Sequence, residues 1–263
     1  MKTMVLVLCF LFGAAMGSFL CCQARRLRRK EKGQKKLGKW SVCLECGHRL
    51  AWYENLPIIS WVLQKGRCRK CGKKIGIAEV LAEVLTGMAF LAVGIYFDCD
   101  GAGILEWCEF GMMLALMIGL AFLAIYDGLY GELPVAVLTI SGFCAIMVVI
   151  LRLWSLFSRS QFSWIAVVET VGAGVLLGGV YLVLYLISKG KWVGDGDYIL
   201  AAIVGLVAGS PFRALVVLCV ANTLATVVMA PVVMKKKNKK IFFGPFLVAA
   251  LVITLVFYDI IRL

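Results

Sequence analysis

The stretch Gly194-Asp195-Gly196-Asp197-Tyr198-Ile199-Leu200 places two acids between glycines, immediately before a long apolar run. Carboxylates at the edge of a membrane segment are costly, so they are functional candidates by default. Glycine allows positive φ angles and lets the backbone approach another group closely. A second acid, Asp127, follows another apolar run and precedes Leu133-Pro134. We therefore expect the rest of the chain to bring Asp127 and Asp197 together.

The composition is that of a membrane protein with several spans. Of the 263 residues, 62% are hydrophobic and 16% are charged, whereas a soluble domain carries about a quarter charged residues. The net charge of +13 is also found in proteins that bind nucleic acid. Here the basic residues lie between apolar segments, where they hold topology and bind anionic lipids. The sequence predicts an all-α polytopic membrane protein with membrane lipids, and no nucleic acid, as partners.

Apolar runs predict about eight transmembrane helices. They lie at 4–22, 77–97, 107–126, 134–151, 163–187, 198–234 and 241–260. The 198–234 run is interrupted at Gly209-Ser210-Pro211 and is counted as two crossings, because the lysine cluster at 235–240 then faces the cytoplasm. With both termini outside, 23 of the 28 Lys and Arg residues lie on the inner side, as the positive-inside rule requires.

This topology places both acids on the cytoplasmic face, because two spans separate Asp127 from Asp197. The helix that follows Asp197 is short for a span. Tyr198 to Ala208 covers 11 residues, about 17 Å of helix against a hydrocarbon core of about 30 Å. We therefore expect this helix to begin before Asp197 or to continue past Pro211.

The chain divides into a first transmembrane helix at 1–22, a cytoplasmic loop domain at 23–78 and a membrane core at 79–263. The run at 4–22 is followed by a cluster of arginines. A cleaved secretory signal has its basic residues before the apolar run, so we expect an uncleaved span with its N-terminus outside. Gly17-Ser18 near the end of this run would allow close contact with another helix.

Two C-x-x-C pairs lie in the polar loop. Cys43 and Cys46 form the first pair, and Cys68 and Cys71 form the second after 21 intervening residues. This spacing predicts a zinc ribbon-like loop in which four thiolates hold one structural zinc with no open position for water. Two separate redox pairs are the alternative, but cytosolic thiols are kept reduced.

The other cysteines and the single histidine give less information about function. Cys99 and Cys108 flank an acidic loop and could pair if it faces an oxidising compartment. His48 is the only histidine in the chain. We expect it beside the zinc site and not as a ligand. With no other histidine in the chain, mechanisms that use a histidine as the general base are excluded.

Two carboxylates at one membrane face indicate the chemistry of an aspartic protease. Neighbouring carboxyl groups do not ionise together, so one retains a proton that the other has lost. The ionised acid can then activate a water while the protonated acid donates to the scissile carbonyl. A transporter that moves ions through carboxylates is an alternative, although such acids more often lie near mid-span within internal repeats. A membrane scaffold built on the zinc ribbon is another alternative, and it would need no acid pair.

The chain resembles the type IV prepilin peptidases, membrane aspartic proteases of the GxGD type, along nearly its whole length. The motifs that carry the resemblance are Gly17-Ser18-Phe19-Leu20 with Arg26, the four cysteines, Asn55-Leu56-Pro57, Glu83-Val84-Leu85-Thr86-Gly87, Asp127 with Leu133-Pro134, Gly194 to Asp197, and Phe243-Gly244-Pro245-Phe246. The resemblance implies that Asp127 and Asp197 are the catalytic pair. Gly194, Gly196, Pro134 and Glu83 are then supporting residues.

The resemblance also implies the substrates and the location. The substrates would be type IV prepilins or pseudopilins, cleaved at the leader on the cytoplasmic side of the bacterial inner membrane. Many members also methylate the new N-terminus with S-adenosylmethionine, and here only the resemblance supports that activity. Ile199 stands where the family usually has lysine, and this departure marks a divergent member.

Overall fold

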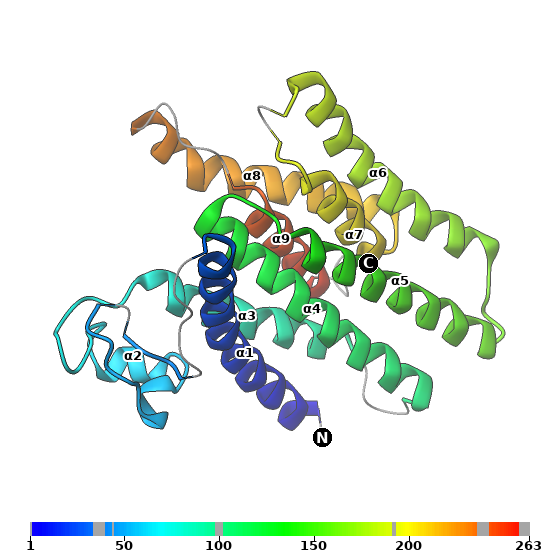
Figure 1. Cartoon of the computed structure of the whole chain (residues 1–263). Coiled ribbons are helices and arrows are strands. Elements are labelled where there is room, and N and C mark those ends of the chain that lie inside the picture. The colour runs from blue at the N-terminus through cyan, green and yellow to red at the C-terminus, as the bar shows by residue number, and fades with distance from the viewer. Residues whose placement is uncertain are drawn as a thin grey trace. The chain divides into compact units, whose positions relative to one another are not determined.

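The computed structural model is built almost entirely from helices and describes residues 2–33, 40–43, 45–97, 102–190, 193–235 and 242–257. No strand is present within these ranges, apart from isolated bridge pairs in the cysteine loop. The chain forms two compact units, Thr3–Leu91 and Ala92–Leu263 (Figure 1). The predicted all-α class is confirmed.

The first unit contains a long helix, the cysteine loop and most of a second long helix. Helix α1 (Lys2–Glu31) continues beyond the apolar run through the arginine-rich stretch. The loop holds a short 3-10 helix η1 (Trp52–Asn55) and α2 (Ile59–Leu63), and α3 (Ile77–Tyr96) follows. A Cβ placed on Gly17 would lie 2.7 Å from the Ala82 carbonyl oxygen. The small residue therefore lets α1 and α3 touch, as the sequence predicts.

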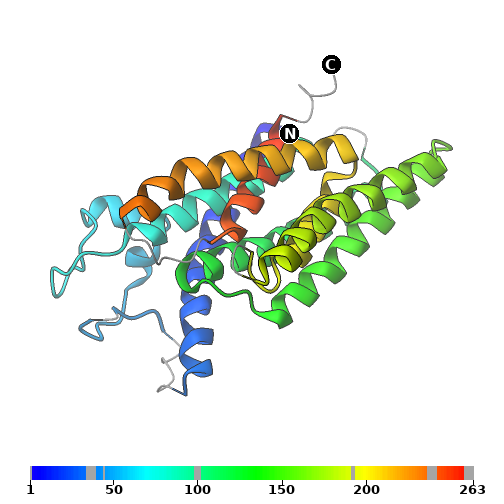
Figure 2. The ribbon, with the colours of Figure 1, turned by 90° about the horizontal axis from the view of Figure 1, so that it is seen from above.

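The second unit is a helical bundle. It comprises α4 (Ile104–Tyr130), α5 (Val135–Ser158), α6 (Trp164–Ser188), α7 (Asp197–Ala208), α8 (Pro211–Lys235) and α9 (Gly244–Val256). Helix α7 packs along α6, and α9 packs against α4, α7 and α8 (Figure 2). Helix α9 therefore contacts both of the helices that carry the predicted acids.

Six of the described helices are long and apolar enough to cross a membrane, and α7 and α9 are shorter apolar helices. Helix α7 has 12 residues, about 18 Å of length. The expectation that it begins before Asp197 or continues past Pro211 is therefore wrong. Gly196 at φ 125° and Gly209 at φ 75° lie outside the right-handed helical region and bound the helix at both ends.

Polar side chains from neighbouring helices cap the C-terminal end of α7. Arg213 Nη1 donates to the Ala208 carbonyl at 3.1 Å, and Arg152 Nη1 donates to the Val207 carbonyl at 3.4 Å. The last carbonyls of a helix have no intrahelical partner. These two arginines supply donors to carbonyls that would otherwise be unpaired in an apolar surrounding.

Parts of two predictions lie outside the described residues. Cys99 and most of the 235–240 lysine cluster belong to ranges that the structure does not describe. The possible Cys99–Cys108 pair and the side on which the lysines lie therefore stay predictions, as does the division at 1–22, 23–78 and 79–263.

Candidate active site and metal centre

The GxGD stretch, Gly194 to Asp197, forms a tight turn in which its first glycine binds the carboxylate of its aspartate. The Gly194 N–H donates to Asp197 Oδ2 at 2.8 Å, and the Asp197 N–H donates to the Gly194 carbonyl at 3.3 Å. A side chain at Gly194 would press on the carboxylate, because a Cβ there would lie 3.2 Å from Asp197 Oδ2. Gly196 has φ 125°, a conformation that favours glycine. The sequence thus predicts correctly why glycines bracket Asp197.

Asp127 is held from a distant part of the chain. It lies in the last turn of α4 and is buried. The Gly244 N–H, at the start of α9, donates to Asp127 Oδ2 at 2.8 Å, and the Phe243 N–H also contacts this carboxylate. A Cβ on Gly244 would lie 2.9 Å from Asp127 Oδ2. Only glycine leaves room for this hydrogen bond.

The two acid motifs meet in the second unit. A Cβ on Gly196 would lie 3.4 Å from Leu133 Cδ1, so the turn before Asp197 packs on the segment that follows Asp127. The Asp197 carboxylate lies within electrostatic reach of Asp127. Both acids are about 95% buried, with 5% and 6% of their surface exposed. The structure therefore brings together the two carboxylates that the sequence singles out.

A short connection between α4 and α5 positions Asp127. Helix α4 ends at Gly131 in the left-handed conformation, with the Gly131 N–H donating to the Asp127 carbonyl at 2.7 Å. Pro134 is the N-cap of α5, and its carbonyl accepts from the Leu138 N–H at 3.0 Å. Pro134 thus lies where α5 begins, and its role in supporting Asp127 stays a prediction. Proline fixes the backbone where the new helix begins.

Glu83, the predicted supporting acid, belongs to the first unit. Its Oε2 accepts from the Ile58 N–H at 2.7 Å, and its carboxylate also hydrogen bonds Ser18. Glu83 is buried. It therefore ties the loop between the cysteine pairs to α1 and α3, which is a local structural role within this unit.

The four predicted zinc ligands converge at one point. The Sγ atoms of Cys43, Cys46, Cys68 and Cys71 all lie within 4.8 Å of one another. The Cys43 and Cys71 sulfurs are 3.9 Å apart, close to the separation of about 3.8 Å for thiolates that bind zinc tetrahedrally at 2.3 Å. The four residues are free cysteines. This donor set suits zinc.

Each cysteine pair sits on the same kind of turn. The Gly47 N–H donates to the Cys43 carbonyl at 3.0 Å, and the Gly72 N–H donates to the Cys68 carbonyl at 2.8 Å. Both glycines have φ of 68°, so each supplies the left-handed residue that the turn needs. The N–H groups of Cys71 and Lys70 point at the Cys68 sulfur and lower the pKa of this thiol to about 6. This favours the thiolate that a metal requires.

His48 lies in the loop of the first cysteine pair, and its backbone carbonyl accepts from the Cys43 N–H at 2.8 Å. Its Nε2 is 3.4 Å from Glu54 Oε2, which also accepts from the Ala51 N–H at 2.8 Å. Glu54 is one of the buried acids of this unit. The histidine and this carboxylate therefore brace the loop next to the first cysteine pair.

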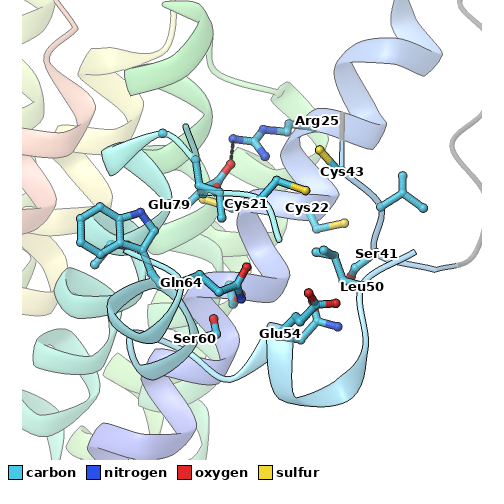
Figure 3. Close-up of a pocket in the computed structure, with 18 of the residues that line it drawn as sticks. Cys21, Cys22, Arg25, Ser41, Cys43, Leu50, Glu54, Ser60, Gln64 and Glu79 are labelled. Atoms are coloured by element: carbon cyan, nitrogen blue, oxygen red, sulfur yellow. Dashed lines mark ion pairs between the residues drawn. The ribbon is translucent and has the colours of Figure 1, made fainter. Parts of the chain in front are cut away.

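A cavity of about 330 Å³ lies between α1, the cysteine loop and the start of α3. Figure 3 shows Arg25 paired with Glu79 on one side of it and Glu54 on the other. Two of the residues that line it, Glu54 and Trp61, each have a buried polar atom, Oε1 and Nε1, with no hydrogen-bond partner among the described residues. An acceptor and a donor thus remain available for a small polar ligand. Sequence analysis missed this cavity, because its lining comes from three separate segments.

Comparisons with known proteins find related sequences along this chain. A family model described as the bacterial peptidase A24 N-terminal domain matches residues 11–97. A prepilin leader peptidase/N-methyltransferase of Klebsiella pneumoniae is 30% identical over 199 residues, which cover 74% of this chain and 82% of that protein. This chain belongs to the prepilin leader peptidase/N-methyltransferase family.

Two further family members show how the similarity is distributed. The prepilin leader peptidase/N-methyltransferase of Pseudomonas aeruginosa is 25% identical over 96% of this chain and 91% of its own length. The protein of the same name from Myxococcus xanthus is 42% identical over 86 residues, a third of this chain and a quarter of that protein. No solved structure matches. The family membership thus extends to the membrane core that holds the acids.

Proposed function

We propose that this protein is a membrane aspartic endopeptidase that cleaves the leader peptide of type IV prepilins or pseudopilins. The observation that carries the proposal is the buried pair of Asp127 and Asp197, each with its Oδ2 held by a glycine N–H. The relatives named prepilin leader peptidase/N-methyltransferase support the substrate class. A transporter is less well supported, because both acids lie at helix ends, whereas the carboxylates of a transporter more often lie near mid-span.

Hydrolysis by this pair needs no covalent intermediate. Two carboxyl groups in a buried site share one proton, because two adjacent negative charges are unfavourable there. The ionised acid takes a proton from water as the water attacks the scissile carbonyl, and the protonated acid donates its proton to the substrate. The Gly194 N–H binds Oδ2 of Asp197, and the other oxygen of this carboxylate has no hydrogen-bond partner among the described residues. That oxygen is therefore open to water or substrate.

The four cysteines would hold zinc as a structural ion. A shell of four thiolates is complete and leaves no position for a reacting water. Zinc bound there would fix the two turns and the loop between them. Its binding energy would then contribute to the folding of the first unit.

N-methylation of the new N-terminus is the second proposed activity, and the cavity of the first unit is its proposed site. S-adenosylmethionine supplies an electrophilic methyl group for transfer to an amine. Its amino group could donate to Glu54 Oε1, and its acceptor atoms could receive the Trp61 indole N–H. These are the two buried polar atoms that lack partners. Isothermal titration with S-adenosylmethionine should show binding that Glu54→Gln weakens.

The charge distribution and the apolar helices support a location of the protein in a membrane. We place the protein in the bacterial inner membrane, with membrane lipids around the six long apolar helices of the described residues and the acid pair on the cytoplasmic side. The arginine-rich end of α1 would then lie at the cytoplasmic surface, where basic residues bind anionic lipids.

The deciding experiment is co-expression with a prepilin in cells that lack their own peptidase. The wild-type chain should yield a shortened pilin, and Asp197→Asn should not. A transporter or a scaffold would leave the prepilin at full length in both cases.

A further inference from the structure

Tyr181 lies in the membrane core beside the acid pair, and neither the motifs nor the family comparison assigns it a role. It is 1% exposed on α6. Helices α6 and α7 touch closely where a Cβ on Gly178 would lie 2.7 Å from Ala202 Cβ and 3.2 Å from the Tyr198 carbonyl oxygen. A Cβ on Gly174 would meet Leu206, further along α7, so the two helices run antiparallel. Three residues beyond Gly178, Tyr181 therefore reaches the level of Asp197.

Tyr181 also contacts Phe243, next to the glycine that binds Asp127. The Tyr181 and Phe243 rings have centroids 4.9 Å apart. Phe243 directly precedes Gly244, whose N–H holds Asp127 Oδ2. The Asp197 carboxylate is also within electrostatic reach of the Tyr181 hydroxyl. These contacts place Tyr181 beside Asp197 and against Phe243, the residue that precedes the glycine bound to Asp127.

The Tyr181 hydroxyl accepts a hydrogen bond, but among the described residues no group accepts its proton. Asn222 Nδ2 donates to the Tyr181 hydroxyl oxygen at 3.4 Å and to the Leu218 carbonyl at 2.8 Å. The Leu218 contact orients the amide so that its NH₂ faces the tyrosine. The hydroxyl therefore accepts from Asn222, and among the described residues it donates to no protein group. A buried donor without an acceptor is costly unless a ligand supplies one.

We propose that Tyr181 donates a hydrogen bond to the scissile carbonyl oxygen of the substrate, and that Asn222 positions it. Water attack converts that oxygen into an anion or a newly protonated hydroxyl, and a donor aimed at it lowers the barrier. The tyrosine keeps its own proton, and both proton transfers remain with Asp127 and Asp197. Tyr181 is thus a catalytic residue and Asn222 a positioning residue. This inference rests on the proposed endopeptidase function.

The test compares Tyr181→Phe with Tyr185→Phe in purified protein that cleaves a prepilin. Tyr185 lies one turn further along α6, and its hydroxyl hydrogen bonds Asp195, outside the proposed pair. Tyr181→Phe keeps the ring against Phe243 and removes only the hydroxyl. We expect it to lower kcat by about 10²–10³-fold, as for loss of one oxyanion donor, with KM nearly unchanged. Tyr185→Phe should retain kcat.

A double-mutant cycle tests Asn222. Asn222→Leu should lower kcat in the wild-type background and add nothing in the Tyr181→Phe background, because both changes remove one unit. A purely structural role for Asn222 would give equal losses in both backgrounds and would overturn the assignment. Wild-type kcat in Tyr181→Phe would refute the role of the tyrosine. If Asp197→Asn remains inactive in the same assay, the endopeptidase proposal still stands.

Discussion

The residues around the two acids contribute through their backbone conformation as much as through side-chain chemistry. Gly196 supplies a positive φ immediately before Asp197. Gly194 and Gly244 bring their N–H groups against the two carboxylates. Asp195 is exposed and hydrogen bonds Tyr185 instead. At this scale, the spacing of glycines decides which acid is held inside the protein and which one faces outward.

Asp127→Asn, Asp197→Asn and the double mutant should be about equally inactive. An amide cannot take the proton from water or share one with its partner, and groups that act as a unit show strongly non-additive losses. Cleavage of a co-expressed prepilin measures the effect at matched protein levels. Asp195→Asn is the matched control and should keep substantial activity. Near-normal processing by Asp197→Asn would end the aspartic-protease interpretation.

Gly244→Ala should reduce cleavage strongly. The added methyl group would lie 2.9 Å from Asp127 Oδ2, so the carboxylate or the start of α9 must move. Gly179→Ala is the control, because a Cβ there meets nothing within 4 Å and alanine is favoured over glycine inside a helix. Initial rates with both purified variants provide the comparison, and equal rates would show that the Gly244 contact is dispensable.

At the scale of elements, the cysteine loop and helix α7 both depend on groups from outside their own segment. The cysteine loop has little regular structure of its own, with one 3-10 helix of 4 residues and one α-helix of 5 residues. Helix α7 ends inside the bundle, where Arg152 and Arg213 reach its last carbonyls. Side-chain donors supply what the local backbone lacks in the second case, and the zinc that we propose would do so in the first.

Replacing Cys43 and Cys46 with serine should reduce bound zinc toward zero. Two remaining thiolates cannot complete a tetrahedral shell, and the loop should become sensitive to protease. Elemental analysis of the purified variant measures the metal. The acid pair lies in the other compact unit, so we expect some cleavage activity to survive. Full zinc content in this variant would contradict the assignment of the ligands.

Arg213→Met should destabilise the bundle by about 1–3 kcal/mol, the cost of leaving a buried carbonyl without its donor. Methionine keeps much of the side-chain length and removes the guanidinium that binds the Ala208 carbonyl. Arg213→Lys retains a charged donor and should lose less. Thermal unfolding in detergent compares the two, and identical midpoints would show that the cap contributes nothing.

At the scale of the whole molecule, charge and hydropathy predict the orientation in the membrane. The basic residues concentrate in the segments 23–78, 188–197 and 235–240, which all follow an odd number of predicted spans. The acid pair shares its face with these segments in that topology. A cytoplasmic substrate leader would then meet the acids without crossing the bilayer.

A cell-impermeant thiol reagent added outside should label Gln161→Cys and not Lys237→Cys. Gln161 is exposed in the connection between α5 and α6, which the topology places outside, and Lys237 belongs to the inner lysine cluster. Labelling is compared with the unsubstituted chain to subtract native cysteines. Permeabilised cells should label both variants. External labelling of Lys237→Cys alone would reverse the topology.

The sequence by itself predicted the helical class, the four cysteines that cluster in the structure, and the two acids that the structure brings together. Each of these depends on local pattern: apolar runs of span length, C-x-x-C turns that need a left-handed glycine, and glycines that bracket Asp197. Only the tertiary structure decided that α7 stops at Ala208, that Gly244 holds Asp127 and that Tyr181 lies beside Asp197. These features join residues from different helices, such as Asp127 and Gly244, which are 117 positions apart. No local pattern encodes contacts of that kind, because they depend on how the helices pack.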